Sequence, residues 1–383
     1  MRVYLDNAAT TPLDPVVLEA MLPYWQQHFG NPSSIHSFGR EVRAAVEKAR
    51  RKVADLLHAR PSEIFFTSCG TEADNTALRG SVHALGIQHI ITSPLEHHAV
   101  LHTVQHLASH GSVALHFVEL DAQGHIDLSH LEALLKQHPH ALVSLMQGNN
   151  EIGNLTDLQA VGTLCRQYDA VYHSDTVQTV GHFQHNLQAT PVDFIVGSAH
   201  KFHGPKGVGF LYVNSDRKIS PLLFGGAQER NMRGGTENVA GIVGLATALE
   251  LACTRLEEDR RHITALKQRL MTGLREKLDG AQFVGDCANL ERSLYTVLNV
   301  SLPPDQMGDM FLFNLDINQI AASGGSACSS GSNVGSHVLQ ALRYNEERHT
   351  VRFSFSKYNT AEEVDFVIDT LVRMRESSDA MQL

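Results

Sequence analysis

The sequence predicts an α/β fold in which helices cover both faces of a mostly parallel β-sheet and a smaller α+β domain follows. As far as residue 235, short apolar runs alternate with segments of helical periodicity, and this βαβ alternation is typical of parallel sheets. The 383 residues exceed one ordinary hydrophobic core, so we expect two domains or one large domain. After residue 235 the alternation ends in a long helical segment and a region richer in turns.

The first predicted elements are a helix over residues 40–57, with apolar side chains at helical spacing, and a series of buried strands. Short apolar runs predict these strands, because strands buried on both faces are apolar throughout. The predicted strands are 64–67, 89–92, 141–146, 171–173 and 194–196, and the predicted helices between them are 71–85, 97–109 and 156–168. The run 207–213 predicts one further strand, for which an antiparallel orientation fits.

The C-terminal part predicts a different, smaller unit. We expect one long helix over residues 238–278, charged in its second half. Strands at 296–300 and 350–354 and a helix at 361–374 then indicate an α+β arrangement. We place the domain boundary near residue 257.

Composition narrows the functional class. The hydrophobic share of 43% and the charged share of 19% are typical of a soluble globular enzyme. The net charge of -10 disfavours nucleic-acid and membrane surfaces. No apolar run is long enough to cross a bilayer, and the first residues lack the apolar core of a signal peptide. The five cysteines include no C-x-x-C pair, which favours a reducing compartment, so we expect a cytoplasmic protein.

Lys201 is the most informative residue, because it lies in a glycine-rich turn directly after a predicted strand. A lysine that loses its proton can form a Schiff base with a carbonyl cofactor such as pyridoxal phosphate. Ser198 and His200 could donate hydrogen bonds to the phosphate of that cofactor. Taken alone, the alternative of a solvated surface lysine is the more common one.

Two more strand ends carry groups that suit such a cofactor. Gly70 and Thr71 follow strand 64–67 at a helix start, where backbone N–H groups bind anions. Asp175 follows strand 171–173 and could keep a pyridine nitrogen protonated, while Gln178 could donate to the ring oxygen. Each segment also reads as an ordinary helix cap that needs no ligand.

Histidines and asparagines follow the other strand ends. His97 could stack on a flat ring and move protons, although a structural histidine fits as well. Asn150 belongs to a polar turn after strand 141–146. His98 and His102 have the i, i+4 spacing of zinc helices, but no matching third ligand is evident, so we expect no resident metal.

The last chemical group is Cys328, in the middle of a Ser/Gly-rich segment. With little apolar anchoring this segment should be mobile, and its cysteine exposed enough to react as a thiolate. Cys165 and Cys253 read instead as buried structural cysteines. Arg352 alternates with apolar neighbours on a predicted strand and could bind a carboxylate through two hydrogen bonds.

Taken together, these motifs resemble those of the NifS/IscS-like cysteine desulfurases, pyridoxal-phosphate enzymes of the class V aminotransferase family. The resemblance runs almost from end to end. The segments that carry it are 4–11, 30–34, 67–75, 96–97, 149–153, 175–181, 198–207, 233–238 and 326–328.

The resemblance implies a fold-type I homodimer. It implies a large domain of residues 15–257 with a mostly parallel seven-stranded sheet, and a small α+β domain of residues 1–14 and 258–383 that carries the Cys328 loop. It also implies a role for each site residue. Lys201 would carry the cofactor, His97 would stack on the ring, Asp175 would face the pyridine nitrogen, Asn150 and Gln178 would hold the ring oxygen, Gly70, Thr71, Ser198 and His200 would hold the phosphate, Thr236 would reach across from the other subunit, and Asn31 and Arg352 would take the substrate carboxylate.

The implied reaction converts L-cysteine to L-alanine and leaves the sulfur as a persulfide on Cys328. The resemblance implies delivery to an acceptor such as an iron–sulfur scaffold protein or a tRNA-thiolation carrier, and Cys328 could contact an iron–sulfur cluster transiently. The segment after Cys328 lacks the usual Glu-Pro, Gly225-Gly226-Ala227 has alanine where a third glycine is frequent, and residues 343–350 look slightly shortened. These departures fall on the Cys328 loop and the partner surface, so they affect which sulfur acceptor the chain would serve and not the core chemistry.

Three alternatives remain open from the residues. One is a selenocysteine lyase or another pyridoxal-phosphate aminotransferase or lyase on the same scaffold. Another is a non-catalytic sulfur carrier or assembly scaffold, which the combination of Lys201, Asp175 and His97 disfavours. A dinucleotide enzyme is the weakest, because Gly204, Gly207 and Gly209 do not form the fingerprint after a first strand.

Overall fold

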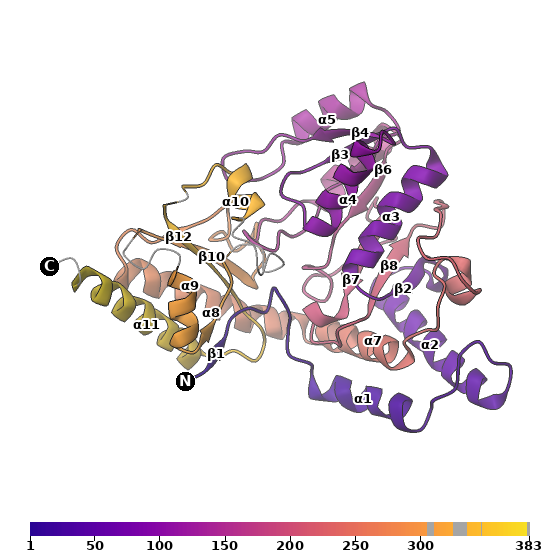
Figure 1. Ribbon diagram of the computed structural model, residues 1–383, viewed down its shortest axis with the longest axis horizontal. Helices are drawn as coiled ribbons and strands as arrows, with labels where there is room; N and C mark the ends of the chain where they lie inside the picture. Colours follow the sequence, from indigo (N-terminus) through magenta and orange to yellow (C-terminus); the bar gives the residue numbers. More distant parts are fainter. Residues whose placement is uncertain (305–309, 325–334, 346, 381–383) are drawn as a thin grey trace.

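A seven-stranded sheet forms the centre of the larger part of the molecule (Figure 1), as the computed structural model shows for residues 1–304, 310–324, 335–345 and 347–380. In spatial order the strands are β2 (Ile64–Thr67), β8 (Gly209–Val213), β7 (Phe194–Ser198), β6 (Val171–Ser174), β5 (Leu142–Ser144), β3 (His89–Thr92) and β4 (Ala114–Phe117). Only β8 runs antiparallel to its neighbours; every other pairing is parallel. This confirms the predicted mostly parallel sheet and the antiparallel strand within 207–213.

Successive residues of each central strand point into different hydrophobic cores, one on each face of the sheet. Ile90 and Phe194 belong to one core, and the adjacent Ile91 and Ile195 belong to the other. The first core is covered by α3 (Gly70–Leu85) and α4 (His98–Ser109), and the second by α2 (Ser37–Leu56), α5 (Leu128–Gln137), α6 (Leu158–Gln167) and α7 (Val239–Thr254). Burial on both faces explains why these strands are apolar without alternation.

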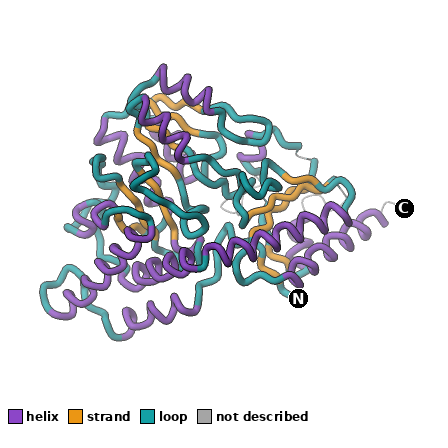
Figure 2. The backbone as a smooth tube through the Cα atoms, turned by 180° about the vertical axis from the view of Figure 1, so that it is seen from behind, coloured by secondary structure: helices purple, strands orange, loops and turns teal. Residues whose placement is uncertain are grey.

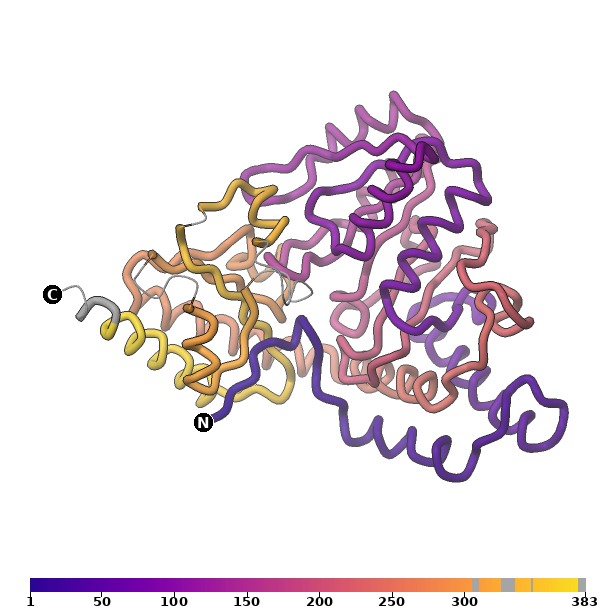
Figure 3. The backbone as a smooth tube through the Cα atoms, viewed as in Figure 1, coloured from indigo at the N-terminus to yellow at the C-terminus, as the bar shows by residue number. Residues whose placement is uncertain are grey.

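The two ends of the chain meet in a second, smaller body. Its described elements are β1 (Val3–Tyr4), α8 (Leu256–Lys277), β9 (Gln282–Phe283), β10 (Val297–Leu302), α9 (Phe311–Ile317), β11 (Ile320–Ala321), β12 (His349–Ser354) and α11 (Ala361–Ala380). β1 pairs in parallel with β11, and β10 pairs antiparallel with both β9 and β12. Figure 3 shows the indigo N-terminal segment beside the orange and yellow C-terminal chain, and the long helices α8 and α11 lie side by side in Figure 2. These elements share one hydrophobic core.

The predicted helix over 238–278 is wrong as a single element. The chain breaks at Arg255 into α7 and α8, which are bent by 73°. The cause is packing, because α7 is buried in the large sheet's core whereas α8 buries Ile263, Leu266 and Leu270 in the other core. By length and apolar composition no single helix in the described ranges could cross a bilayer, and only this bent pair passes when its two halves are taken together.

The sequence reasoning also missed several short elements. They are α1 (Pro15–Gln26), the 3₁₀ turns η1 (Pro61–Glu63), η2 (Ala199–Lys201) and η3 (Gln228–Asn231), the edge strand β4, helix α5, the short strands β1, β9 and β11, helix α9, and α10 (His337–Ala341). β4 was not predicted because an edge strand of four residues, half of them exposed, has no buried apolar run.

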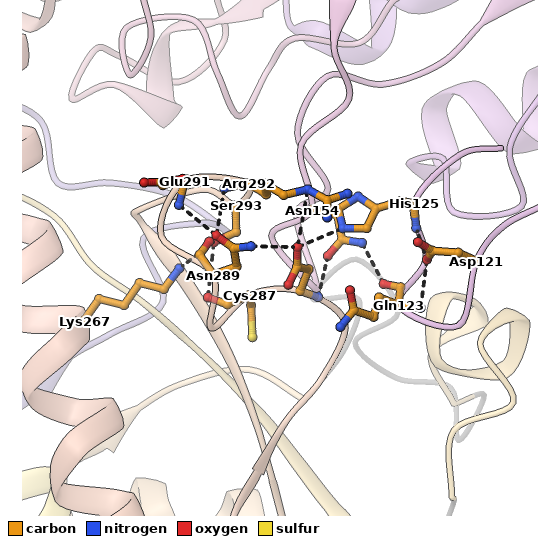
Figure 4. A network of polar contacts seen from close by, with 11 residues as sticks. Asp121, Gln123, His125, Asn154, Lys267, Cys287, Asn289, Glu291, Arg292 and Ser293 are labelled. Atoms are coloured by element: carbon orange, nitrogen blue, oxygen red, sulfur yellow. Dashed lines mark hydrogen bonds and ion pairs between the residues drawn. The ribbon is translucent and has the colours of Figure 1, made fainter. Parts of the chain in front are cut away.

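Polar contacts join the loops of the larger part to those of the smaller one (Figure 4). Asp286 accepts from His125 Nε2 at 3.0 Å, and its backbone N–H donates to Asn154 Oδ1 at 2.9 Å. On the smaller part's side, Lys267 Nζ donates to Ser293 Oγ at 3.0 Å. These contacts tie residues that lie far apart in the chain into one junction.

Candidate active site

The carboxyl ends of five mutually parallel strands meet at one edge of the large sheet, which is where open α/β sheets bind ligands. A cavity of about 270 Å³ lies there. All the predicted site residues except Asn31, Thr236 and Cys328 line it. They are Gly70, Thr71, His97, Asn150, Asp175, Gln178, Ser198, His200, Lys201 and Arg352.

Lys201 ends the 3₁₀ turn that follows β7, so its side chain enters the cavity from the sheet edge. Its Nζ donates to the carbonyl oxygens of Ala8 and Ala9, the latter at 2.9 Å. The N-terminal segment that leaves the smaller body therefore passes directly over the lysine. Gln178 holds the same segment, since its Nε2 donates to Ala8 O at 3.0 Å.

The start of α3 fits an anion. Cys69 is the N-cap residue and its side chain makes no capping hydrogen bond, so this side chain leaves the N–H groups at the positive end of the helix open to a ligand. A side chain at Gly70 would meet Val177 Cγ2 at 2.7 Å, so this close approach requires glycine. Burial, and then Lys201, lowers the pKa of the nearby His200 to about 4, which leaves its imidazole neutral and able to donate.

Asp175 is buried at the end of β6, and its Oδ1 accepts from Val177 N at 2.9 Å. Burial raises the pKa of this carboxyl, while Lys201 opposes that rise. Asp175 forms no ion pair within the described residues, and a protonated ring nitrogen is the kind of group that would complete its site.

His97 caps α4 on the opposite side of the cavity, where its Nδ1 accepts from Ala99 N at 3.1 Å. Burial, followed by the charge of Lys201, lowers the pKa of His97 to about 4. The cavity is therefore bounded by a neutral imidazole, a buried carboxyl and a lysine, which suits a flat aromatic ring that also carries an anionic group.

Arg352 brings the smaller body to this cavity. It lies on β12, is almost fully buried, and donates from Nη1 to Asn150 O and from Nη2 to Asp6 Oδ1, both at 2.8 Å. Its buried Nε has no hydrogen-bond partner within the described part of the chain. A guanidinium fixed in this way can receive an anionic group of a ligand in the cavity.

Three predicted residues do not line the cavity. Asn31 lies in an exposed turn, where its side chain accepts from Ser33 N at 2.9 Å. Thr236 is exposed and follows Gly235, whose φ of 103° requires glycine. Cys328 and its neighbours lie outside the described residues, so the expectations of exposure and mobility there stay predictions.

Sequence reasoning missed two buried acids beside the cavity. Asp74 Oδ1 lies 3.2 Å from His173 Nε2, and His173 Nδ1 lies 2.9 Å from Ser144 Oγ. Burial, and then Asp175, raises the pKa of Asp74 well above its usual range, and burial lowers the pKa of His173 to about 3. Burial also raises the pKa of Glu96, which accepts from Met146 N at 2.8 Å. Nothing in the local pattern distinguishes Asp74 from an exposed helix residue.

The structure also supplies a third histidine beside the pair that the sequence singled out. His337 Nδ1 lies 2.9 Å from His98 Nε2, and His337 Nε2 lies 2.9 Å from Glu96 O. Because a carbonyl only accepts, His337 donates from Nε2 and accepts at Nδ1, and His98 donates. A hydrogen-bonded chain explains this contact without a metal, and the expectation that His98 and His102 hold no metal stays a prediction.

Comparison with known proteins agrees with this geometry. The family model described as aminotransferase class-V matches residues 3–367. The chain is 42% identical over 379 residues to the cysteine desulfurase IscS of Dictyoglomus turgidum, covering 98% of this chain and 95% of the relative. It is 41% identical over 382 residues to a cysteine desulfurase of Nostoc sp., covering 99% and 94%. Among solved structures, a NifS-like protein superposes with a TM-score of 0.90 at 38% identity, covering 98% of this chain and 100% of the other.

Proposed function

The chain belongs to the aminotransferase class-V family, and from that membership we propose that it is a cysteine desulfurase, which converts L-cysteine to L-alanine and passes the sulfur on as a persulfide. Its cofactor is pyridoxal phosphate, as in the rest of this group. The observation that carries the proposal is the convergence of Lys201, Asp175, His97 and Arg352 on one cavity. Near-full-length similarity to cysteine desulfurases selects this activity within the family.

The residues present fit the cofactor. Lys201 would bind its carbonyl carbon, Asp175 would pair with the ring nitrogen, and His97 would cover one face of the ring. The start of α3 at Gly70 and Thr71, with Ser198 and His200, would hold the phosphate, while Asn150 and Gln178 would face the ring oxygen. When bound, the cofactor delocalises the negative charge that develops at the substrate Cα.

The protein's own groups would carry out three tasks. Arg352 would hold the substrate carboxylate, with Asn31 contributed from across a dimer. Lys201 would move the Cα proton. The Cys328 thiolate attacks the substrate sulfur, so that an S–S bond forms while the substrate C–S bond breaks. The electron pair of the broken bond stays on the carbon skeleton, which takes up a proton to become alanine, and Cys328 keeps the sulfur as a persulfide.

A homodimer would complete the site. Trp25, Phe29, Ile35, Phe38 and Phe224 are all more than half exposed, and an apolar surface of this kind marks an interaction site. Asn31 lies between Phe29 and Ile35 on this surface. Gln228 Nε2 approaches Ser33 Oγ at 3.5 Å, so the loop that leads to Thr236 borders the same surface. Thr236 and Asn31 would then serve the cavity of the partner subunit. The cysteine pattern suits a reducing compartment, which supports the proposal that the enzyme and its sulfur acceptor, such as an iron–sulfur scaffold protein, act in the cytoplasm.

The test is to incubate the holoenzyme with L-cysteine and a thiol reductant and to measure alanine and sulfide together. We expect equal amounts of both without an added keto acid. Cys328→Ala should stop sulfide release and leave the visible spectrum of the bound cofactor intact, whereas Lys201→Ala should change that spectrum. Keto-acid-dependent product formation would indicate an aminotransferase instead, and full activity of Cys328→Ala would refute the role of that thiol.

A further inference from the structure

Three histidines meet at the far edge of the large sheet, away from the residues that line the cavity. His89 lies on β3 and His116 on the edge strand β4, while His138 ends α5. In the parallel register His89 pairs with Ala114 and Ile91 pairs with His116. Because side chains alternate along a strand, His89 and His116 project from the same face, two residues apart. Figure 1 shows α5 beside β4, and the ring contacts of His138 with His89 and His116 bring it to that face.

The three rings are already close enough to share one small ligand. His89 Nδ1 lies 3.1 Å from His116 Nε2, and one nitrogen of each of the three rings lies within 4.8 Å of the others. His138 stacks on both partners, with ring centroids at 4.3 Å from His89 and 4.1 Å from His116. In a tetrahedral zinc site with Zn–N bonds of about 2.0–2.1 Å, ligand nitrogens are about 3.3 Å apart. His138 would have to rotate out of the stack to aim a ring nitrogen at the same point as its two partners.

The donor set identifies the class of ion. The group consists of imidazoles alone, and nitrogen donors select zinc and the late first-row metals over magnesium or calcium, which need oxygen ligands. A neutral imidazole offers the lone pair of one ring nitrogen to a metal. All three side chains are only half-buried, so an ion can enter from solvent.

We propose that His89, His116 and His138 form a binding site for one Zn²⁺ ion, with water as the fourth ligand. The site joins two neighbouring strands to the end of a helix, so the ion would stabilise the edge of the sheet without taking part in the reaction. β4 is the last strand of the sheet and its residues are partly or fully exposed, which makes this edge the place where an added link would act most strongly.

Zinc binding to untagged holoenzyme tests the proposal. The protein is stripped with a chelator, dialysed against ZnSO₄ and measured for zinc per chain and for melting temperature, with MgSO₄ as the comparison salt. Cys328 can also bind zinc, so the readout is the difference between variants. We expect His138→Ala, and the near-isosteric His116→Gln, to lose one equivalent of zinc or to raise the half-saturating concentration at least about tenfold. Both should also lose the zinc-dependent rise in melting temperature.

His102→Ala is the matched control, because it removes a histidine that stacks on His98 outside this cluster; it should bind zinc as the parent chain does. Equal zinc binding in all variants, or a loss only in His102→Ala, would overturn the proposal. Anomalous diffraction from zinc-soaked parent crystals gives a result that needs no variant. A peak between the three rings is expected, and its absence at saturating zinc would also overturn the proposal.

Discussion

Arg352 and Asp6, which lie 346 residues apart in the chain, form a partly buried ion pair with Nη2 and Oδ1 at 2.8 Å. The pair joins β12 to the segment after β1, and the same guanidinium donates to Asn150 O beside the cavity. Asp6 therefore fixes the direction in which Arg352 faces a ligand. Under the proposed function, Asp6 positions the group that binds the substrate carboxylate.

Asp6→Asn and Arg352→Lys should raise the Michaelis constant (KM) for L-cysteine by different factors. Asparagine keeps an acceptor for Arg352, so we expect KM to rise about fivefold with little change in kcat. Lysine loses the paired geometry of the guanidinium, so a rise of about 10- to 100-fold is expected, the range of a charged hydrogen bond worth about 1.5–3 kcal/mol. Asp365→Asn, which breaks the exposed pair with Arg269, is the control and should leave KM unchanged. Equal effects of Asp6→Asn and Arg352→Lys would refute the distinction.

Replacing Asp175 or Asp74 by asparagine should lower the activity to very different extents. Asp175→Asn removes a charge that the proposed ring nitrogen needs, so activity should fall by about 10²-fold, the effect of losing about 3 kcal/mol from a buried pair. Asp74→Asn should cost less than about threefold, because burial keeps the pKa of Asp74 high and the carboxyl already neutral. An asparagine is close to the protonated acid in size and is likewise neutral. Activity at saturating cofactor, measured with the visible spectrum, distinguishes the two; a large loss in Asp74→Asn would show that this acid is ionised.

Most residues that line the cavity were predictable because a local sequence pattern marks each of them. Lys201, Asp175, His97 and Gly70 each follow a strand that an apolar run reveals, and parallel strands bring their carboxyl ends together. The contacts of Arg352 with Asp6 and of His98 with His337 were not predictable, since each joins segments more than 200 residues apart. The bend at Arg255 was missed for a related reason. Helical periodicity continues through it, and only the division between two hydrophobic cores ends the first helix there.

Arg50 should be critical for stability, although it lies away from the cavity. It makes a two-pronged ion pair with Glu229 at 2.7 and 2.8 Å, and both side chains are at most 3% exposed. Glu229 also accepts from Phe66 N, and it begins three consecutive residues with positive φ. Arg50→Ala leaves that carboxylate buried without its cation, so we expect a loss of about 3–5 kcal/mol in the free energy of unfolding.

Denaturant unfolding of the holoenzyme measures this loss. Lys52→Ala is the matched control on the same helix, because its partner Glu250 is 45% exposed, and it should cost less than about 1 kcal/mol. The double variant Arg50→Met with Glu229→Gln removes both charges and should recover part of the lost stability. If Arg50→Ala and Lys52→Ala were equally mild, the buried pair would have no special role.

Lys267 should make stability depend on pH in the alkaline range. Its side chain is fully buried at the junction of Figure 4, where Nζ donates to Ser293 Oγ and to Leu294 O. Burial lowers the pKa of Lys267 to about 8, against 10.5 for the free side chain. Between these two values the unfolded chain binds more protons than the native protein, so the free energy of unfolding rises with pH. Below about pH 8 the buried charge destabilises the fold fully, and above about pH 10.5 it no longer does.

The measurement is the difference in unfolding free energy between the parent chain and Lys267→Met, taken at pH 7.5 and at pH 10.5. A pKa shift of this size corresponds to about 3 kcal/mol. Between pH 7.5 and pH 10.5 the free energy of unfolding of the parent should therefore rise by roughly that much relative to the variant. Groups that titrate equally in both proteins cancel in the difference. Lys277→Met is the control, since Lys277 is exposed and paired with Asp369, and it should show no such gain. A flat difference for Lys267→Met would mean that this lysine keeps its ordinary pKa, and that water or a nearby acid solvates the ammonium inside the fold.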